Sequence, residues 1–189
     1  MPSLEARGFP SPVIAIIARM LRPYRGRLPA VDPSVYVDAS AQVIGDVSIG
    51  AESSVWMNVV IRGDVNVIRI GARTNIQDGV VVHVMHDTHP TRIGDDVTIG
   101  HGALVHGCTI RDRVLIGMGA IVLNGAVIGE DSIVAAGTLV TEGAVIPPRS
   151  MVMGSPGKVR RVLTDAEVAS IMDYATNYVR YRLDYMVRG

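Results

Sequence analysis

The sequence predicts an all-β fold, a parallel β-helix built from six-residue repeats, followed by one C-terminal α-helix. A β-branched aliphatic residue recurs at every sixth position near the start, at Val31, Val37, Val43, Ile49, Val55, Ile61 and Val67. This period fits neither an α-helix, with 3.6 residues per turn, nor a lone strand, with a period of two. Glycine often follows the aliphatic residue, as at Gly50 and Gly71, which is typical of tight corners. Three repeats would close a triangular coil, and coils of this triangular prism would stack about 4.8 Å apart.

Composition supports one elongated domain with a repetitive core. The chain has 189 residues, 48% of them hydrophobic but only 4% aromatic, which suits a core of valine and isoleucine. Its 18 basic and 18 acidic residues cancel, so no overall field favours nucleic acid or an anionic membrane as a partner. A single cysteine excludes an internal disulfide and favours a reducing compartment. We expect a cytoplasmic protein.

The chain divides into three parts. Residues 1–30 are expected to form an N-terminal packing segment, because the apolar run from Val13 to Leu21 is too short to span a bilayer and lacks the features of a signal peptide. Residues 31–156 form the β-helix domain. Residues 164–187 are predicted to form the C-terminal helix, which Thr164 and Glu167 would open as a capping box. Its apolar spacing indicates that it covers one flank of the prism.

The six-residue period is interrupted where histidines gather. Eleven residues separate Val82 from the next aliphatic position, Ile93, so about five residues bulge out, and this stretch contains His83, His86 and His89. The remaining two histidines, His101 and His106, follow in the next coil.

Spacing places His83 and His106 on one corner of the prism. Val82 and Val105 fall on the same face of successive coils, so the histidines that follow them should stack about one strand spacing apart, close enough to share a metal ion. His101 falls on a different corner, and a second copy related by a threefold axis could supply it. The spacing therefore predicts a homotrimer with three metals, each held by three histidines and open to water. The alternative is corner histidines without a metal.

Several motifs resemble those of the γ-class carbonic anhydrases, which are left-handed β-helix trimers with a metal between subunits. They are Arg62-Gly63-Asp64, Asn75-Ile76-Gln77-Asp78-Gly79, Val82-His83, Gly100-His101-Gly102 and Val105-His106-Gly107-Cys108. The resemblance covers roughly residues 30–185 and implies the left-handed form of the coil.

The resemblance also implies a reaction and a role for each matching residue. It implies a lyase that reversibly hydrates carbon dioxide to bicarbonate by a metal-bound hydroxide at the trimer interfaces. Zn²⁺ is the expected metal, although Fe²⁺ and Co²⁺ also accept neutral nitrogen ligands. Gln77 would orient the hydroxide, and Asn75 lies in the same pocket motif. The metal ligands would be His83, His101 and His106. Arg62 and Asp64 would pair with charged groups across the interface, with Asp78 as a candidate partner, and the alternative is an ordinary solvated ion pair.

One feature of the family is missing, namely an acidic loop whose glutamate carries protons to solvent. His86, in the bulge, is the best replacement because histidine titrates near neutral pH, and His89 is second. Both also fit ordinary loop residues. Tyr178, in the last helix, is a further candidate for a neighbour's pocket. Cys108 is interpreted as a small buried residue and not as a nucleophile.

Three other functions remain open. Hexapeptide-repeat acyltransferases share the fold and use coenzyme A with one histidine as general base. A metal-dependent thioesterase could use the same centre on a thioester carbonyl. A catalytically silent metal-binding trimer would bind metal without turnover. The three histidines together with Gln77 and Asp78 favour the anhydrase, because a transferase has no need for this set.

Overall fold

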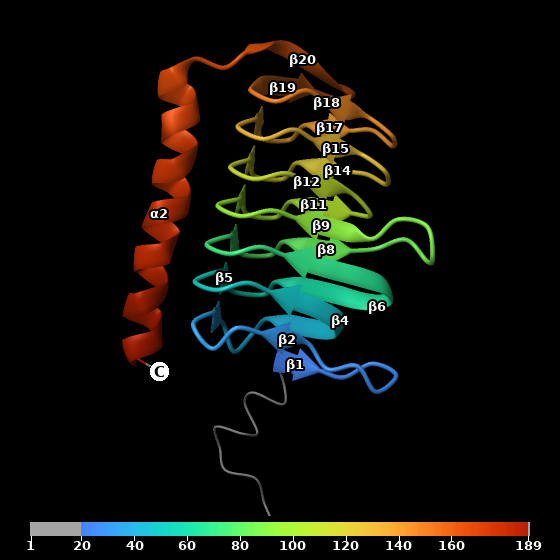
Figure 1. Ribbon diagram of the computed structural model, residues 1–189, viewed down its shortest axis with the longest axis vertical. Coiled ribbons are helices and arrows are strands. Elements are labelled where there is room, and N and C mark those ends of the chain that lie inside the picture. Colours follow the sequence, from blue (N-terminus) through green and yellow to red (C-terminus); the bar gives the residue numbers. More distant parts are fainter. Residues whose placement is uncertain (1–19, 189) are drawn as a thin grey trace, which may run out of the picture.

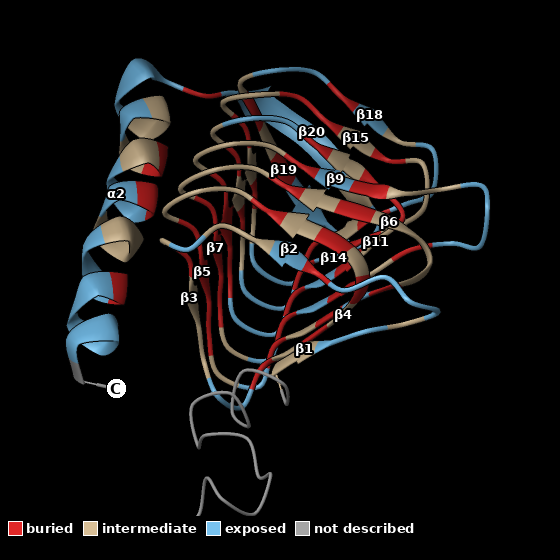
Figure 2. Cartoon of the chain, turned by 60° about the horizontal axis from the view of Figure 1, so that its bottom comes forward, coloured by how far each residue is buried: buried red, intermediate tan, exposed pale blue. Residues whose placement is uncertain are grey.

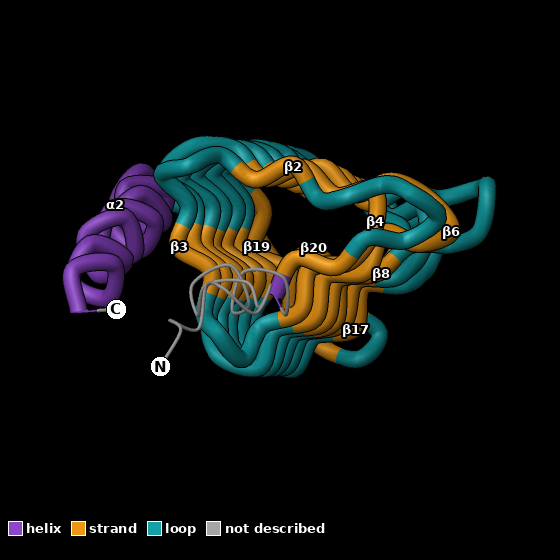
Figure 3. The backbone as a smooth tube through the Cα atoms, turned by 90° about the horizontal axis from the view of Figure 1, so that it is seen from below, coloured by secondary structure: helices purple, strands orange, loops and turns teal. Residues whose placement is uncertain are grey.

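The computed structural model describes residues 20–188, which wind into a left-handed β-helix with one long helix, α2 (Asp165–Arg188), alongside it (Figure 1). Viewed along the axis, the coils superpose as a three-sided prism with α2 outside one edge (Figure 3). Neighbouring strands pair in parallel throughout the stack, and only the last pair is antiparallel. The predicted fold class is confirmed.

One face of the prism is the sheet of eight strands nearest to α2. In order along the chain these strands are β3 (Tyr36–Val37), β5 (Ser54–Val55), β7 (Asn75–Ile76), β10 (Thr98–Ile99), β13 (Leu115–Ile116), β16 (Ile133–Val134), β19 (Ser150–Gly154) and β20 (Gly157–Val162).

The other two faces belong to a twelve-stranded sheet, because its longest strand, β6 (Val60–Ile70), bends around a corner and pairs with β8 at one end and β9 at the other. The wing that starts from β8 contains β8 (Val81–His83), β11 (Leu104–His106), β14 (Ile121–Val122) and β17 (Leu139–Val140). The wing that starts from β9 contains β9 (Thr91–Ile93), β12 (Thr109–Ile110), β15 (Val127–Ile128) and β18 (Val145–Ile146). The first coil adds β1 (Leu21–Arg22), β2 (Ala30–Val31) and β4 (Gln42–Ile49).

The inward-pointing aliphatic residues form one continuous core along the axis. Val82 pairs with Val105 in the strand register, and both are fully buried, as the spacing predicts. The seventh aliphatic position is an exception, because Val67 is only half-buried while its neighbour Ile68 is fully buried. In β4, Val43 and Ile49 are six positions apart, but their register partners in β6, Ile61 and Ile70, are nine apart. Three extra residues of β6 therefore lie in the corner that contains Asp64. The expectation for Val67 was therefore wrong, because Ile70 and not Val67 pairs with Ile49 as the next inward repeat position.

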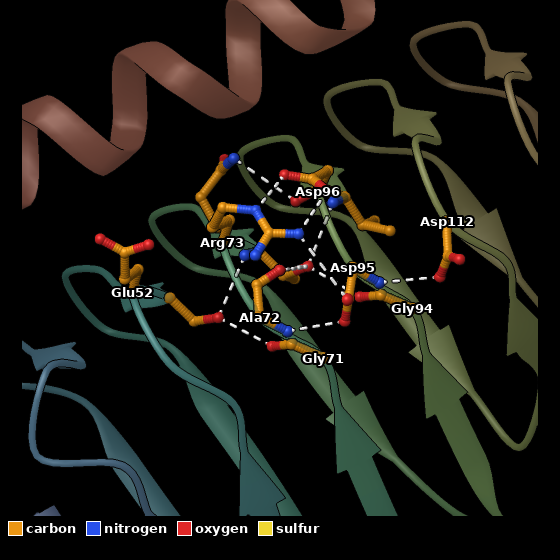
Figure 4. A network of polar contacts seen from close by, with 12 residues as sticks. Glu52, Gly71, Ala72, Arg73, Gly94, Asp95, Asp96 and Asp112 are labelled. Carbon is orange, nitrogen blue, oxygen red and sulfur yellow. Dashed lines mark hydrogen bonds and ion pairs between the residues drawn. The ribbon is translucent and has the colours of Figure 1, made fainter.

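Side-chain carboxylates join successive coils at another corner of the prism (Figure 4). Asp95 accepts a hydrogen bond from the backbone N–H of Ala72 in the preceding coil, and Asp112 accepts one from the N–H of Asp95, each at 2.9 Å. Arg73 donates two hydrogen bonds of 2.7 Å to the carboxylate of Asp96. The contacts of Asp95 and Asp112 satisfy backbone N–H groups that short strands leave unpaired at the corners.

Helix α2 begins as the capping box predicts. The backbone N–H of Thr164 donates to Glu167 Oε2 at 3.0 Å, and that of Glu167 donates to Thr164 Oγ1 at 3.3 Å. Its buried residues face the eight-stranded sheet, which it contacts at β3, β5, β7 and β10 (Figure 2). Near its end, the buried Arg182 donates to Ser34 O at 2.8 Å and to Glu52 at 3.0 Å. The helix thus fastens the first coils to the flank of the prism.

Most of the expected N-terminal packing segment lies outside the described residues. The part that is described, from residue 20 onward, contributes β1, which pairs with β4, and β2, which also pairs with β4. None of the helices in the described part of the chain has the length and apolarity needed to span a bilayer.

Candidate metal centre

Five polar side chains from successive coils form a hydrogen-bonded column on the corner that follows strands β8, β11, β14 and β17. We call Asp64, His83, His106, Asn124 and Glu142 the corner column. Asp64 Oδ1 lies 3.0 Å from His83 Nε2, and His83 Nδ1 lies 3.1 Å from His106 Nε2. His106 Nδ1 lies 2.7 Å from Asn124 Oδ1, and Asn124 Nδ2 donates to Glu142 Oε1 at 2.9 Å. The predicted stacking of His83 on His106 is confirmed by their strand register.

The Asp64 carboxylate determines which nitrogen of His83 carries hydrogen. Burial raises the pKa of Asp64, but hydrogen bonds from His83 and Arg62 outweigh it and lower the pKa below the usual value. An ionised carboxylate only accepts, so His83 Nε2 must donate to it. Burial lowers the pKa of His83, against the opposing effect of Asp64, and the ring is therefore neutral near pH 7. Its Nδ1 then presents a lone pair toward His106.

The two facing nitrogens suit a shared metal ion. Two nitrogen ligands bound to one tetrahedral zinc, at about 2.0–2.1 Å each, lie about 3.3 Å apart. The observed separation of 3.1 Å between His83 Nδ1 and His106 Nε2 is close to this value. Within residues 20–188, however, no cluster of three or more His, Cys, Asp or Glu side chains could by itself hold a metal. One chain thus brings together two of the three predicted ligands.

The third predicted ligand, His101, lies on another corner, in the turn between β10 and β11. Its Nδ1 is 2.9 Å from Asp78 Oδ2, and both side chains are about half exposed. Gln77 is buried nearby and donates to Asn75 Oδ1 at 3.0 Å, while Asn75 donates to the hydroxyl of Thr98 at 2.8 Å. His101 therefore sits with the amides of its own chain and apart from the corner column.

A cavity of about 290 Å³ lies beside this second group, between the prism and α2. Gln77, His101 and Tyr178 line it, together with apolar residues that include Leu115 and Met118. Burial and the nearby Asp78 carboxylate raise the pKa of Tyr178, and its ring packs edge-on against Trp56, with the centroids 5.3 Å apart. Tyr178 thus belongs to a cavity of its own chain.

The other predicted residues lie around these two groups. His86 is in the exposed loop between β8 and β9, where its Nδ1 lies 2.8 Å from Asp87. Arg62 is half exposed and pairs with Asp64 of the same chain. Cys108 is 1% exposed in the core, so its interpretation as a small buried residue is confirmed, and burial raises the pKa of its thiol to about 12, which disfavours the thiolate.

Two members of the corner column, Asn124 and Glu142, were not predicted from the sequence. Each follows the previous member by 18 residues, which is one coil, so counting coils onward from His106 would have found them. His89 lies beside these two residues, lining a cavity of about 360 Å³.

The chain is similar to carbonic anhydrases and to other hexapeptide-repeat proteins. Residues 107–142 match the family model described as bacterial transferase hexapeptide (six repeats). A carbonic anhydrase from Geobacillus kaustophilus is 46% identical over 85% of this chain and 87% of its own length. The mitochondrial gamma carbonic anhydrase 1 of Arabidopsis thaliana is 49% identical over 80% of this chain and 57% of its own. Among solved structures, a hexapeptide transferase family protein from Anaplasma phagocytophilum is 40% identical, with a TM-score of 0.85 over 88% of this chain and 98% of its own.

The matches to these relatives cover most of the β-helix. Their sequence identities are well above the level at which only the fold is shared. The motifs around Arg62, Gln77, His83, His101 and His106 lie in this same part of the chain. The chain therefore belongs to the γ-class carbonic anhydrase family of hexapeptide-repeat proteins.

Proposed function

We propose that this protein is a carbonic anhydrase that reversibly hydrates carbon dioxide to bicarbonate at metal centres shared between the subunits of a homotrimer. The observation that supports the proposal is the division of the predicted site into two halves on different corners of one prism. His83 and His106 form one half, while His101 forms the other with Gln77 and Asp78. Neither half is sufficient alone.

A threefold assembly joins such halves without any change in the fold. In a cyclic trimer each chain presents one corner to one neighbour and another corner to the other neighbour, so every interface receives one copy of each half. His83 and His106 of one chain and His101 of the next would then hold the metal. We propose Zn²⁺ as the metal, and Fe²⁺ or Co²⁺ would accept the same neutral nitrogen ligands.

The bound metal would act as a Lewis acid that brings the pKa of a water molecule to near neutrality. Gln77 is suited to orient the reacting oxygen, because it lines the cavity and its amide can both donate and accept, while the hydrogen bond from its Nε2 to Asn75 fixes the direction of the amide. The apolar side chains of Leu115 and Met118 suit a nonpolar gas in the same cavity. The exposed His86 would pass the released proton to solvent.

An acyl-transfer or thioester-hydrolysis activity is the second candidate. The structural likeness to a hexapeptide transferase family protein at 40% identity favours it. The two candidates differ in the room that their substrates need. A thioester requires a pocket for its acyl group, whereas carbon dioxide does not. A catalytically silent metal-binding trimer is the third, and it predicts bound metal without turnover of either substrate.

Stopped-flow carbon dioxide hydration tests the proposal. The protein is purified without oxygen and loaded separately with zinc and with iron, and metal content is counted on the same samples. We expect turnover in proportion to bound metal and its loss in His106→Ala. One metal per chain with no hydration would refute the anhydrase, and hydrolysis of an acetyl thioester by the same samples would then favour the second candidate.

A further inference from the structure

The C-terminal members of the corner column, Asn124 and Glu142, have no role in the proposed reaction, yet their hydrogen bonds have a fixed direction. Asn124 lies between His106 and Glu142 and contacts both through different atoms, its Oδ1 at 2.7 Å and its Nδ2 at 2.9 Å. A neutral imidazole carries hydrogen on one nitrogen only. The partner of Nδ1 therefore decides whether the Nε2 of His106 carries a lone pair or a hydrogen.

Glu142 decides the direction of the Asn124 amide. A carboxylate only accepts hydrogen bonds, so it selects the amide orientation that points the Nδ2 group toward it. The reverse orientation would place the amide oxygen against the carboxylate, oxygen to oxygen. The Oδ1 atom consequently faces His106 and requires a hydrogen on the Nδ1 of that ring.

The two ends of the column thus oppose each other across the histidine pair. Asp64 draws the hydrogen of His83 to Nε2, and Asn124 draws the hydrogen of His106 to Nδ1. The two nitrogens that face each other at 3.1 Å are then both bare, although a hydrogen on either one would join them by a hydrogen bond. Two lone pairs that face each other repel in the absence of a cation, and the same arrangement suits the binding of a metal cation.

We propose that Glu142 and Asn124 are positioning residues that fix the Nδ1–H tautomer of His106, so that its Nε2 lone pair faces that of His83 and is ready for a metal ion. The inference rests on the proposed metal centre but concerns residues outside its ligand set, Asn124 one coil and Glu142 two coils beyond His106. Partners of this kind typically contribute about 10-fold to 100-fold to metal affinity. In this proposal Glu142 affects His106 only by fixing the orientation of the Asn124 amide, which leads to a specific expectation.

The consequence is that Glu142 should become dispensable when residue 124 is a carboxylate. Both oxygens of an aspartate accept, so Asn124→Asp keeps the acceptor for His106 in either orientation. We expect Glu142→Ala to weaken Zn²⁺ binding by about 10-fold when Asn124 is present, and to have no such effect in the Asn124→Asp background. Asn124→Leu, which removes the acceptor, should weaken binding in either case. Glu130→Ala removes a carboxylate elsewhere on the prism and serves as the matched control.

The tautomer itself is read from the ¹⁵N shifts of histidine-labelled, metal-free trimer, which contains only five histidines per chain. The spectra are recorded at about pH 8.5, well above the ordinary histidine pKa of about 6.5. We expect His106 to carry hydrogen on Nδ1 in the unaltered protein and in Asn124→Asp, and to lose this preference in Glu142→Ala and Asn124→Leu.

Two results would overturn the proposal. One is an Nε2–H tautomer of His106 in the unaltered protein, and the other is an equal loss of zinc affinity from Glu142→Ala in both backgrounds, since that would indicate a general effect of charge or folding. If the unaltered trimer binds no zinc, the proposed function fails, while the tautomer spectra still decide the role of Glu142 and Asn124.

Discussion

Mixing two inactive variants tests whether each metal centre is shared between chains. His101→Ala removes one half of every centre, and His106→Ala removes the other half, so each variant alone should form trimers without complete sites. In a mixed trimer, a His101→Ala chain still offers His83 and His106, and a neighbouring His106→Ala chain still offers His101. An interface in that order recovers the full set of ligands.

The size of the recovery follows from the symmetry of the trimer. When equal amounts of the two variants assemble at random, a complete site needs a His101→Ala chain at one position and a His106→Ala chain at the next, which occurs at about one quarter of interfaces. Every trimer that contains both variants has one such interface. We therefore expect about one quarter of the unaltered protein's bound zinc and hydration rate, measured by metal analysis and stopped flow after co-expression.

A second mixture provides the control. His83 and His106 belong to the same half of the site, 3.1 Å apart in one chain, so a mixture of His83→Ala with His106→Ala should recover nothing. Equal recovery in both mixtures would point to metal bound outside the proposed centre. No recovery in the first mixture, with mixed trimers verified by mass, would refute the shared site.

Three further predictions follow. We expect His86→Ala to lower kcat by about 10-fold or more at low buffer concentration, with kcat/KM unchanged and the loss reversed by added imidazole, whereas unchanged kcat would remove His86 from the proton path. Cys108 should resist thiol reagents in the folded protein and react fully in urea, because burial raises its pKa to about 12, and rapid labelling without denaturant would contradict its position in the core. The pKa of Glu167 is lowered from 4.5 to about 2, mainly by the hydrogen bond from Arg161, so its stabilising effect is complete above about pH 4.5 and is lost as the pH falls toward 2. Urea unfolding should show that Glu167→Gln flattens the pH dependence in this interval, and an unchanged acid limb would contradict the assignment.

The fold could be predicted because a β-helix repeats one physical requirement many times. Each coil needs inward aliphatic residues at its three sides and small residues at its corners. Few other folds produce a six-residue period of this kind, so the period indicates the fold. The same regularity placed His83 over His106, because both follow aliphatic residues that pair in the register. Val67 was misassigned because the corner of β6 contains three extra residues, and a periodic pattern does not indicate where in the coil such residues lie.

The candidate site was less predictable because hydrogen-bond direction is not encoded in spacing. The 18-residue interval places Asn124 under His106, but only the positions of both partners show that the amide oxygen faces the ring. The pairing of Arg62 with Asp64 of its own chain is a similar case, since a two-residue spacing is equally compatible with contacts to another chain. Sequence indicates which residues share a corner, and the rotamers decide which atoms meet.

The division of the site between two corners links metal binding to assembly. If the ligand set is complete only when two chains meet, as proposed, the trimer is the metal-binding species. Metal would then stabilise the trimer by the same free energy with which assembly strengthens metal binding. Removing metal should therefore promote dissociation, and dilution below the assembly concentration should release metal. A chain in which His83, His106 and His101 formed one group would show neither effect. In the proposed trimer, the separate positions of His106 and His101 would make dissociation and metal release a single coupled equilibrium.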